Sequence, residues 1–431
     1  MSDNKKFGFW SIVLLGINGV IGSGIYLLPG KAMKIIGPGS IWIYIFDTLL
    51  VMSMALCFAE VGGLFDKNGG PYVYAKEAFG EFVGFEVGIM KWAISIIAWA
   101  TMAVGFATAL SKLIPQAATP FAKNLIATTI LVGLGLVNIA GVKATKYLNN
   151  IVTVAKLLPL ILFVIIGIFF IKGGNFTPMF PNGTSGATIG SAAILIFYAF
   201  TGFESIAVAA EDMDEPQKNV PKAIIVTMIL SSIVYILVQI ISVGILGGAL
   251  AESTTPVADA AKVFMGGFGE KFVAIATLLS IGGINIAASF NAPRSGVALA
   301  EDGILPKYIA KKNKHDVPYI AVIITVLLAI PVAVSGTFTQ LAMISVISRF
   351  AQYIPTCLSV IVFRKRGMKS TYTMPFGSLL PIISVMVSIW LLTKATKEQI
   401  LWGLGALVIG IPLYFILKWL QNRDAKLTQS M

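Results

Sequence analysis

The chain has 431 residues, of which 57% are hydrophobic and only 12% are charged. About a quarter of the residues in a soluble domain are charged, so this composition excludes an ordinary water-soluble protein and leaves no room for a separate soluble domain. The net charge of +12 would suit a nucleic-acid-binding protein, but the basic residues lie between apolar runs along the whole chain. We therefore expect an integral membrane protein.

The apolar runs predict the elements. A helix needs about 20 apolar residues to cross the hydrocarbon core of a bilayer. The runs lack the ten-residue alternation of a membrane β-barrel, so we expect an all-α fold. Twelve transmembrane helices are predicted, in chain order, over residues 9–33, 39–64, 82–112, 121–141, 147–172, 187–210, 223–250, 263–300, 319–336, 338–363, 376–395 and 398–420.

The lysines and arginines predict the orientation of these helices. With an even number of spans, both termini lie on one side of the membrane. If that side is the cytoplasm, the cytoplasmic segments carry roughly twice as many basic residues as the opposite loops, as the positive-inside rule requires. We therefore expect both termini in the cytoplasm, and we expect the basic residues to set topology first and to contact lipids second, without a role in nucleic-acid binding.

Two predicted spans contain glycines at mid-membrane depth. The first reads GVIGSGI over residues 19–25, and the sixth reads FTGFE over residues 200–204. Glycine in a helix interior costs about 1 kcal/mol relative to alanine. Unwound backbone at this depth is tolerated only where it is buried in protein or lines a cavity. A matched pair of such interruptions is the sequence sign of a transporter's binding site.

The backbone groups freed at the two interruptions suit the two ends of an amino acid. The N–H groups of Ser23 and Gly24, at the start of a half-helix, suit a carboxylate. Carbonyl groups near Val20, Tyr198 and Thr201 suit an ammonium group. The alternative is that these glycines only allow close packing between helices, which is common in membrane proteins.

Four stretches in order along the chain carry a resemblance to a known family. They are GSGI over 22–25 with Pro29-Gly30; EVG over 60–62 through GGPYVY over 69–74 to Phe79-Gly80; FTGFE over 200–204 with Glu211 and PQKNVP over 216–221; and Asn291 with Arg294 and EDGILP over 301–306. They resemble the amino acid–polyamine–organocation (APC) superfamily of transporters. Within it, the apolar side-chain pocket that the alignment below predicts is closer to that of the L-amino-acid and Ser/Ala/Cys exchangers.

The resemblance implies a single membrane domain over residues 1–431 that works by alternating access. Inverted repeats would occupy about residues 9–172 and 187–363, with peripheral helices at about 376–420. In such transporters the amides after the first interruption bind the substrate carboxylate, carbonyls of both interruptions bind the amino group, and an aromatic side chain can cover the substrate.

Alignment with the arginine/agmatine antiporters of this superfamily predicts the side-chain pocket. It places Trp99 at a polar third-span position, and Ile284 where an eighth-span tryptophan holds a guanidinium. Arginine would need a cation–π partner or an acid there, so an apolar pocket favours a small or medium neutral amino acid. The expected substrate-binding residues are Val20, Ile21, Gly22, Ser23, Gly24, Trp99, Tyr198, Phe200, Thr201, Gly202 and Ile284.

Three charged residues within spans are candidates for coupling or gating, because a charge in a membrane is costly. Sodium-independent relatives imply that the Lys156 ammonium replaces a sodium ion and bonds carbonyls around Gly19; the alternative is a lysine that snorkels to the interface. Glu204 is a candidate proton or gating site, or else a structural carboxylate. Arg294 is expected to pair with Glu60 or Glu204 in an inner gate, or else to face the surface.

We therefore expect a secondary transporter of small neutral amino acids in the plasma membrane of a bacterium, with transport by exchange independent of sodium. The alternatives are a proton-coupled permease, a carrier of polyamines or cationic amino acids, and a membrane amino acid sensor. The sequence carries no Walker loop, metal-ligand spacing or hydrolase elbow, so we expect no enzyme activity, metal or cofactor. The oligomeric state, any accessory subunit, and the roles of Asp47 and Arg349 stay open.

Overall fold

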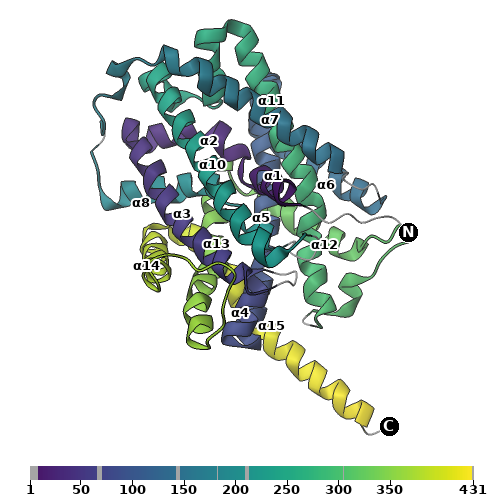
Figure 1. Ribbon diagram of the computed structural model, residues 1–431. Coiled ribbons are helices and arrows are strands. Elements are labelled where there is room, and N and C mark those ends of the chain that lie inside the picture. The colour runs from purple at the N-terminus through teal and green to yellow at the C-terminus, as the bar shows by residue number, and fades with distance from the viewer. Residues whose placement is uncertain are drawn as a thin grey trace.

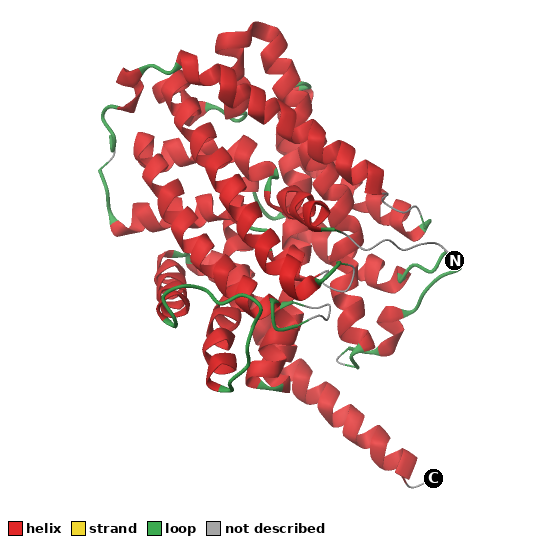
Figure 2. Cartoon of the chain, in the orientation of Figure 1, coloured by secondary structure: helices red, strands yellow, loops and turns green. Residues whose placement is uncertain are grey.

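Figures 1 and 2 show the computed structural model, which describes residues 8–65, 70–141, 146–181, 183–208, 213–303 and 305–429. Within these ranges the chain forms helices and loops and no strand, so the expected all-α fold is confirmed for this part of the protein. Three motif residues, Gly69, Glu211 and Ile304, lie outside the described residues.

The helices follow one another with short connections. The α-helices are α1 Phe9–Val20, α2 Ser23–Ile36, α3 Ser40–Gly62, α4 Pro71–Phe79, α5 Glu81–Leu110, α6 Pro120–Ile139, α7 Lys146–Gly167, α8 Gly186–Phe197, α9 Glu204–Val208, α10 Pro216–Leu246, α11 Pro256–Glu301, α12 Tyr319–Val334, α13 Phe338–Lys365, α14 Leu379–Lys394 and α15 Lys397–Gln429. The 3₁₀-helices are η1 Gly37–Gly39, η2 Pro115–Ala118, η3 Ile168–Phe170, η4 Gly173–Phe176, η5 Tyr198–Phe200, η7 Gly247–Glu252 and η8 Lys307–Ala310.

Within the described residues, seven helical stretches are long and apolar enough, by length and composition, to cross a membrane: Ser23–Gly62, Glu81–Leu110, Pro120–Ile139, Pro216–Glu252, Pro256–Glu301, Phe338–Lys365 and Lys397–Trp419. Shorter apolar helices occupy Phe9–Val20, Lys156–Phe170, Gly186–Phe200, Tyr319–Val334 and Leu379–Lys394. All of these overlap predicted spans, but Ser23–Gly62 joins the second half of the predicted span 9–33 to the predicted span 39–64. The count of twelve transmembrane helices and the inverted repeat stay predictions.

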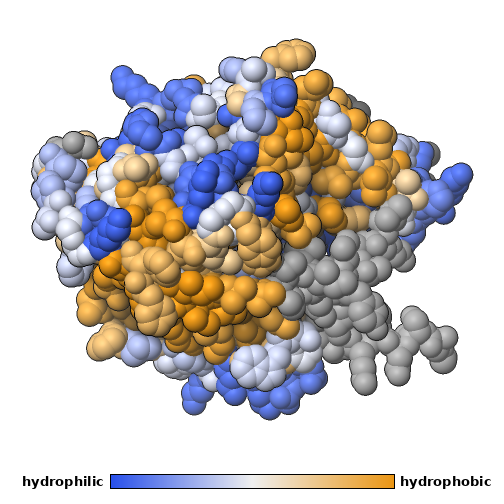
Figure 3. Space-filling model, turned by 90° about the horizontal axis from the view of Figure 1, so that it is seen from above, coloured by the Kyte–Doolittle hydropathy of each residue, from blue (hydrophilic) through white to orange (hydrophobic). Residues whose placement is uncertain are grey.

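The outer surface is apolar over large areas. Phe121, Phe169, Phe268 and Val408 are 78%, 82%, 71% and 71% exposed. Figure 3 shows broad hydrophobic areas, separated from patches of hydrophilic residues. Exposed apolar patches of this extent are unfavourable in water and mark contact with a membrane or a partner, so the surface supports a membrane location.

Several helix starts have local causes. Proline stands at the first position of α4, α6, α10 and α11, where its missing N–H is not needed. The side chain of Thr119 caps α6, and Thr337 with Gln340 forms a capping box on α13. The prolines at the start of α10 and α11 lie before the apolar runs of these helices. The two helices therefore begin at Pro216 and Pro256 rather than at the expected residues 223 and 263. The loop between the second and third spans also contains a helix, α4, that the hydropathy pattern does not predict.

The two glycine-rich interruptions meet at the centre of the fold. α1 ends at Val20 and α2 begins at Ser23; α8 passes through η5 and the extended residue Thr201 to α9. Around them, α5 packs against α11 and α13, while α1 and α3 pack against α10, and α2 packs against α8 and η5 (Figure 1). The interruptions are therefore enclosed by the long helices rather than exposed at the surface.

Candidate functional site

A small cavity lies between the two interruptions. Its volume is about 100 Å³, several times the roughly 10–15 Å³ that one water molecule needs, so it can hold a compact solute. The lining residues come from the first interruption (Gly19, Val20, Gly22, Ser23, Gly24), the second (Tyr198, Ala199, Thr201, Gly202), α5 (Ala98, Met102), α11 (Ile284, Ala288) and α13 (Arg349).

Glycines allow the two interruptions to approach so closely. A Cβ added to Gly24 would lie 2.8 Å from Cα of Ala199. A Cβ added to Gly202 would lie 2.4 Å from the carbonyl oxygen of Gly19, and Gly202 has a φ of +113°, which side chains with a Cβ rarely adopt. Because backbone atoms are the neighbours in both cases, the cavity walls require glycine at these positions.

The start of α2 supplies the electropositive side of the cavity. Ile21 and Gly22 have non-helical backbone angles, and the helix then runs from Ser23. The N–H groups of the first residues of a helix have no partner within it and stand at the positive end of its dipole. Ser23 and Gly24 line the cavity, so the arrangement suits a carboxylate.

The carbonyl groups expected to meet an ammonium group differ in availability. The carbonyl of Val20 accepts a hydrogen bond from Oη of Tyr235 at 2.8 Å, which leaves it one lone pair. The carbonyl of Tyr198 accepts from both N and Oγ1 of Thr201, at 3.2 and 2.8 Å, so both of its lone pairs are used within its own turn. Counting the bonds made by described residues, only the carbonyl of Val20 retains a free lone pair of these two.

Three side chains meet at another wall of the cavity. Oγ of Ser23 lies 3.2 Å from Oη of Tyr198 and donates to Sδ of Met102 at 3.3 Å. The ring of Tyr198 packs edge-on against Phe338, with 5.7 Å between their centroids. Tyr198 therefore connects the first interruption to α5 and α13.

Lys156 of α7 holds the first interruption together and is not one of the residues that line the cavity. Its side chain is fully buried, and Nζ donates to the carbonyls of Asn18 and Ile21 at 2.8 and 2.7 Å and to Oδ1 of Asn18. These groups lie on both sides of Gly19 and Val20. The ammonium group does not snorkel to an interface in this structure, and it compensates the carbonyls that the end of α1 leaves without helical partners.

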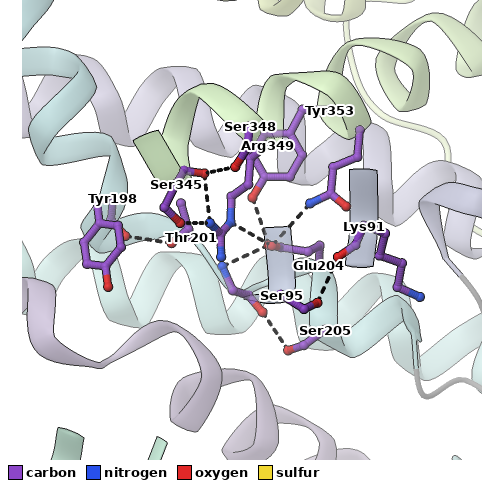
Figure 4. A network of polar contacts seen from close by, with 12 residues as sticks. Lys91, Ser95, Tyr198, Thr201, Glu204, Ser205, Ser345, Ser348, Arg349 and Tyr353 are labelled. Carbon is purple, nitrogen blue, oxygen red and sulfur yellow. Dashed lines mark hydrogen bonds and ion pairs between the residues drawn. The ribbon is translucent and has the colours of Figure 1, made fainter. Parts of the chain in front are cut away.

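A buried ion pair stands at the second interruption (Figure 4). Nε of Arg349 lies 3.1 Å from Oε1 of Glu204, and the other carboxylate oxygen accepts from N of Gly202 and Oη of Tyr353, both at 2.9 Å. Arg349 also donates to the carbonyl of Ser345 at 3.0 Å. Both charges are thus desolvated, and the ion pair with its additional hydrogen bonds offsets the cost of burying them. The pair ties α9 to α13.

The structure separates the remaining candidates. Eight of the expected substrate-binding residues line the cavity; Ile21, Trp99 and Phe200 do not, although all three are buried. Trp99 points elsewhere because the cavity side of α5 is formed by Ala98 and Met102. The carbonyl of Ile21 binds Lys156, and Phe200 packs against Tyr235 with 5.1 Å between centroids.

The expected ion pair of Arg294 with Glu60 or Glu204 is wrong for this conformation. Arg294 is exposed on α11. Glu60 instead binds Arg364 of α13 through two hydrogen bonds, of 2.5 and 2.6 Å, and Glu204 binds Arg349. The distant helix α13 supplies both partners, which spacing along the sequence does not reveal.

Sequence reasoning assigned no role to Asn18, Met102 or Tyr235 and left that of Arg349 open, although they contact or line the site. An arginine within a predicted span was the only signal among them. In the described part of the chain, no group of three or more His, Cys, Asp and Glu residues could hold a metal ion.

The fold and the site define a helical membrane protein with a small cavity between two interrupted helices. A family model described as amino acid permease matches residues 7–419. The chain belongs to this family, which lies within the APC superfamily, and the resemblance seen in the sequence is confirmed. The family and its relatives are transporters rather than enzymes.

Relatives match over nearly the whole chain. An uncharacterized transporter of Mycobacterium tuberculosis is 32% identical over 95% of this chain and 90% of its own. The branched-chain amino acid permease BcaP of Bacillus subtilis is 27% identical over 99% of this chain and 95% of its own. The serine/threonine exchanger SteT of Bacillus subtilis is 26% identical over 96% of this chain and 97% of its own.

Proposed function

We propose that this protein is a sodium-independent exchanger of small neutral amino acids that works by alternating access. The observation that carries the proposal is the cavity of about 100 Å³, bounded by the positive end of α2 and by the apolar side chains of Met102, Ile284 and Ala288. The helix end suits a carboxylate, and the carbonyl of Val20 has a lone pair for an ammonium group. The small apolar remainder favours a substrate such as alanine, serine or threonine.

Charge in the cavity argues against a cationic substrate. Arg349 lines the cavity, and its partner Glu204 is already bound to it. A second cation would be repelled by this guanidinium without meeting a free carboxylate among the described lining residues. Carriers of polyamines or of cationic amino acids need the opposite arrangement. The serine/threonine specificity named for SteT and the branched-chain specificity named for BcaP also favour a neutral amino acid.

The role of Lys156 supports transport without sodium. Its ammonium occupies the group of oxygens formed by Asn18 and Ile21. Carbonyl and amide oxygens of this kind are ligands for a monovalent cation. The ammonium group of Lys156 would therefore replace a bound sodium ion at these oxygens. We propose that this bond keeps the two halves of the first interrupted helix in the binding geometry.

Glu204 and Arg349 are proposed as a gate below the cavity. The ion pair joins α9, which follows the second interruption, to α13. Passage of the substrate between α9 and α13 would require this pair and the bond of Tyr353 to Glu204 to separate. We further propose twelve transmembrane helices, a five-plus-five inverted repeat with two peripheral helices, and both termini in the cytoplasm.

Counterflow in proteoliposomes without sodium tests the proposal. Vesicles are preloaded with one unlabelled amino acid at a time, and entry of labelled alanine is followed. Preloading with alanine, serine or threonine should drive accumulation, while arginine or putrescine should not. Accumulation that occurs only with sodium, or only against internal cations, would refute the assignment.

A matched pair of variants ties the result to the cavity. Gly24→Val would place a side chain onto Ala199 and should abolish counterflow. Gly267→Val is the control, because a Cβ at this exposed residue of α11 meets no atom within 4 Å. Equal transport by the two inserted variants would mean that the substrate binds elsewhere.

A further inference from the structure

A second buried polar cluster lies between α3 and α10, outside the set of residues that line the cavity. We name it the α3–α10 stripe. In it, Nε2 of Gln239 donates to Oγ of Ser40 at 2.8 Å. Many of its other buried polar atoms have no hydrogen-bond partner in the structure: Oη of Tyr44, both carboxylate oxygens of Asp47, Oγ1 of Thr48, Oε1 of Gln239, and Oγ of Ser231, Ser232 and Ser242.

Contacts along the stripe fix the register of the two helices. Ser40 of α3 meets Gln239 of α10. Four residues further on α3 and four residues back on α10, Tyr44 and Tyr235 both pack against Phe200, with centroids 6.3 and 5.1 Å away. The helices are therefore antiparallel here. Residues three or four apart share a helix face, so the next level of the same face places Asp47 opposite Ser232.

Asp47 is the one acidic residue of the stripe. Its side chain is fully buried, and neither oxygen has a hydrogen-bond partner among the residues that the structure describes. An ionised carboxylate in such a place would be strongly disfavoured unless a cation lay beside it. The structure pairs it with none within the described residues, so the carboxyl group carries its proton in this conformation.

The elements packed against α3 account for the other ionisable groups around it. α8 contributes none, and the cationic Lys394 of α14 lies over the ring of Trp390. The remaining cations are Lys31 and Lys34 of α2, the latter bound to Glu252, Lys365 at the end of α13, and Lys218 and Lys222 at the start of α10. Two acids are already paired, Glu60 of α3 with Arg364 of α13 and Glu204 of α9 with Arg349 of α13. The other ionisable groups are the buried thiols of Cys57 and Cys357 and the tyrosines Tyr26, Tyr44, Tyr198, Tyr235 and Tyr353.

The stripe is connected to the back of both interrupted helices. Tyr235 donates to the carbonyl of Val20 in the first interruption, and Phe200 belongs to η5 of the second. Both aromatic rings contact each other, and Phe200 also contacts Tyr44, which is one turn from Asp47. Rearrangement of either interruption during transport would therefore change the packing around Asp47 and admit water.

We propose that Asp47 is a proton-binding site that couples amino acid transport to a proton gradient. The inference rests on the proposed function. The carboxyl group is protonated while the stripe is dry, and it releases the proton to water on the other side when the carrier changes conformation. Exchange needs no release, because the carrier crosses loaded and protonated in both directions. Net uptake needs it, since the proton must pass from Asp47 to the water inside, and the empty carrier then returns with water in the stripe that solvates the carboxylate.

The test compares two modes of transport in the same proteoliposomes. Counterflow measures exchange, and uptake into vesicles with an alkaline interior measures coupling. For the wild type, the proton gradient should raise net alanine uptake severalfold. Asp47→Asn imitates the protonated acid and cannot ionise. It should keep counterflow within about twofold, which corresponds to about 0.4 kcal/mol, and lose the stimulation by the gradient.

Glu86→Gln is the matched control. Glu86 is also a buried acid without partners for its carboxylate oxygens, but it lies on α5 against Gly410 of α15, away from the stripe. This variant should retain the stimulation. Retention by Asp47→Asn, or loss in Glu86→Gln alone, would overturn the proposal, as would stimulation of the wild type by sodium or potassium gradients in place of protons.

A measurement on the wild type keeps the proposal testable if Asp47→Asn does not fold. An inward alanine gradient alone should carry protons into the vesicles, which a pH-sensitive dye inside them reports as acidification. Alanine entry without acidification would overturn the proposal. Silence of the wild type in counterflow would instead overturn the proposed function, and this inference with it.

Discussion

Lys156→Met is the sharpest perturbation of the proposed mechanism. Methionine keeps an unbranched apolar side chain of similar length but lacks the ammonium group. The substitution leaves the carbonyls of Asn18 and Ile21 and Oδ1 of Asn18 without their common donor, in a place where Lys156 is fully buried. The physical effect is therefore on the backbone around the first interruption, not on a surface charge.

The size of the effect follows from these contacts. A buried acceptor left without a partner costs about 1–3 kcal/mol. The two backbone carbonyls together therefore destabilise the native geometry by about 2–6 kcal/mol. The side-chain amide of Asn18 adds little, because it can turn toward another partner. Natural domains are stable by about 5–15 kcal/mol, so the protein should still fold with lower stability. A change of about 3 kcal/mol reduces the population of a binding-competent state by about 100-fold.

Counterflow of alanine and thermal unfolding in detergent check this prediction together. Lys156→Met should unfold at a lower temperature and lose most of its counterflow, even at saturating substrate inside. Lys271→Met is the control, because Lys271 of α11 is exposed, and it should behave as the wild type. Full counterflow and unchanged unfolding of Lys156→Met would refute the idea that this ammonium holds the interrupted helix.

Three further substitutions test the site. Gly202→Ala combines a φ of +113° with a Cβ only 2.4 Å from a backbone oxygen, so it should cost about 2–5 kcal/mol and abolish transport, while Gly267→Ala should change neither unfolding nor counterflow. Glu204→Gln leaves the buried guanidinium of Arg349 without its counter-charge; about 3–5 kcal/mol of stability should be lost in chemical unfolding, and intact stability would mean that water already screens the pair. Ile284→Trp should fill the cavity and reduce alanine counterflow more than tenfold without lowering the unfolding temperature; normal transport would place the substrate elsewhere.

Local chemistry determined the helices and the interruptions. Apolar runs of sufficient length favour helices in a membrane whatever their neighbours are. Glycine at positions 19, 22, 24 and 202 lowers the local helix propensity. In the structure, α1 ends at Val20 and α8 ends at Phe197, close to these glycines. For the same reason the sequence points to Ser23 and Gly24, since a helix start exposes N–H groups regardless of what lies around it.

Partners across the fold were beyond reach of the sequence. Arg294 was expected to meet an acid, but Arg349 and Arg364 of α13 meet Glu204 and Glu60 instead. On α5, Trp99 was expected in the pocket, yet Ala98 and Met102 line it. Neighbouring residues on a helix point in directions about 100° apart. The sequence of α5 alone does not determine which of these directions faces the cavity.

The sequence by itself therefore determined the class of protein, the family and the place where two helices break, because composition, hydropathy and glycine act within a few residues of chain. Only the tertiary structure decided which side chains enclose the cavity, which acids and bases pair, and that Asp47 is left without a partner between α3 and α10. These contacts depend on how helices that are distant in the chain pack together. Different packings differ in the rotation and register of the helices, while the helix propensity of each segment is the same in all of them.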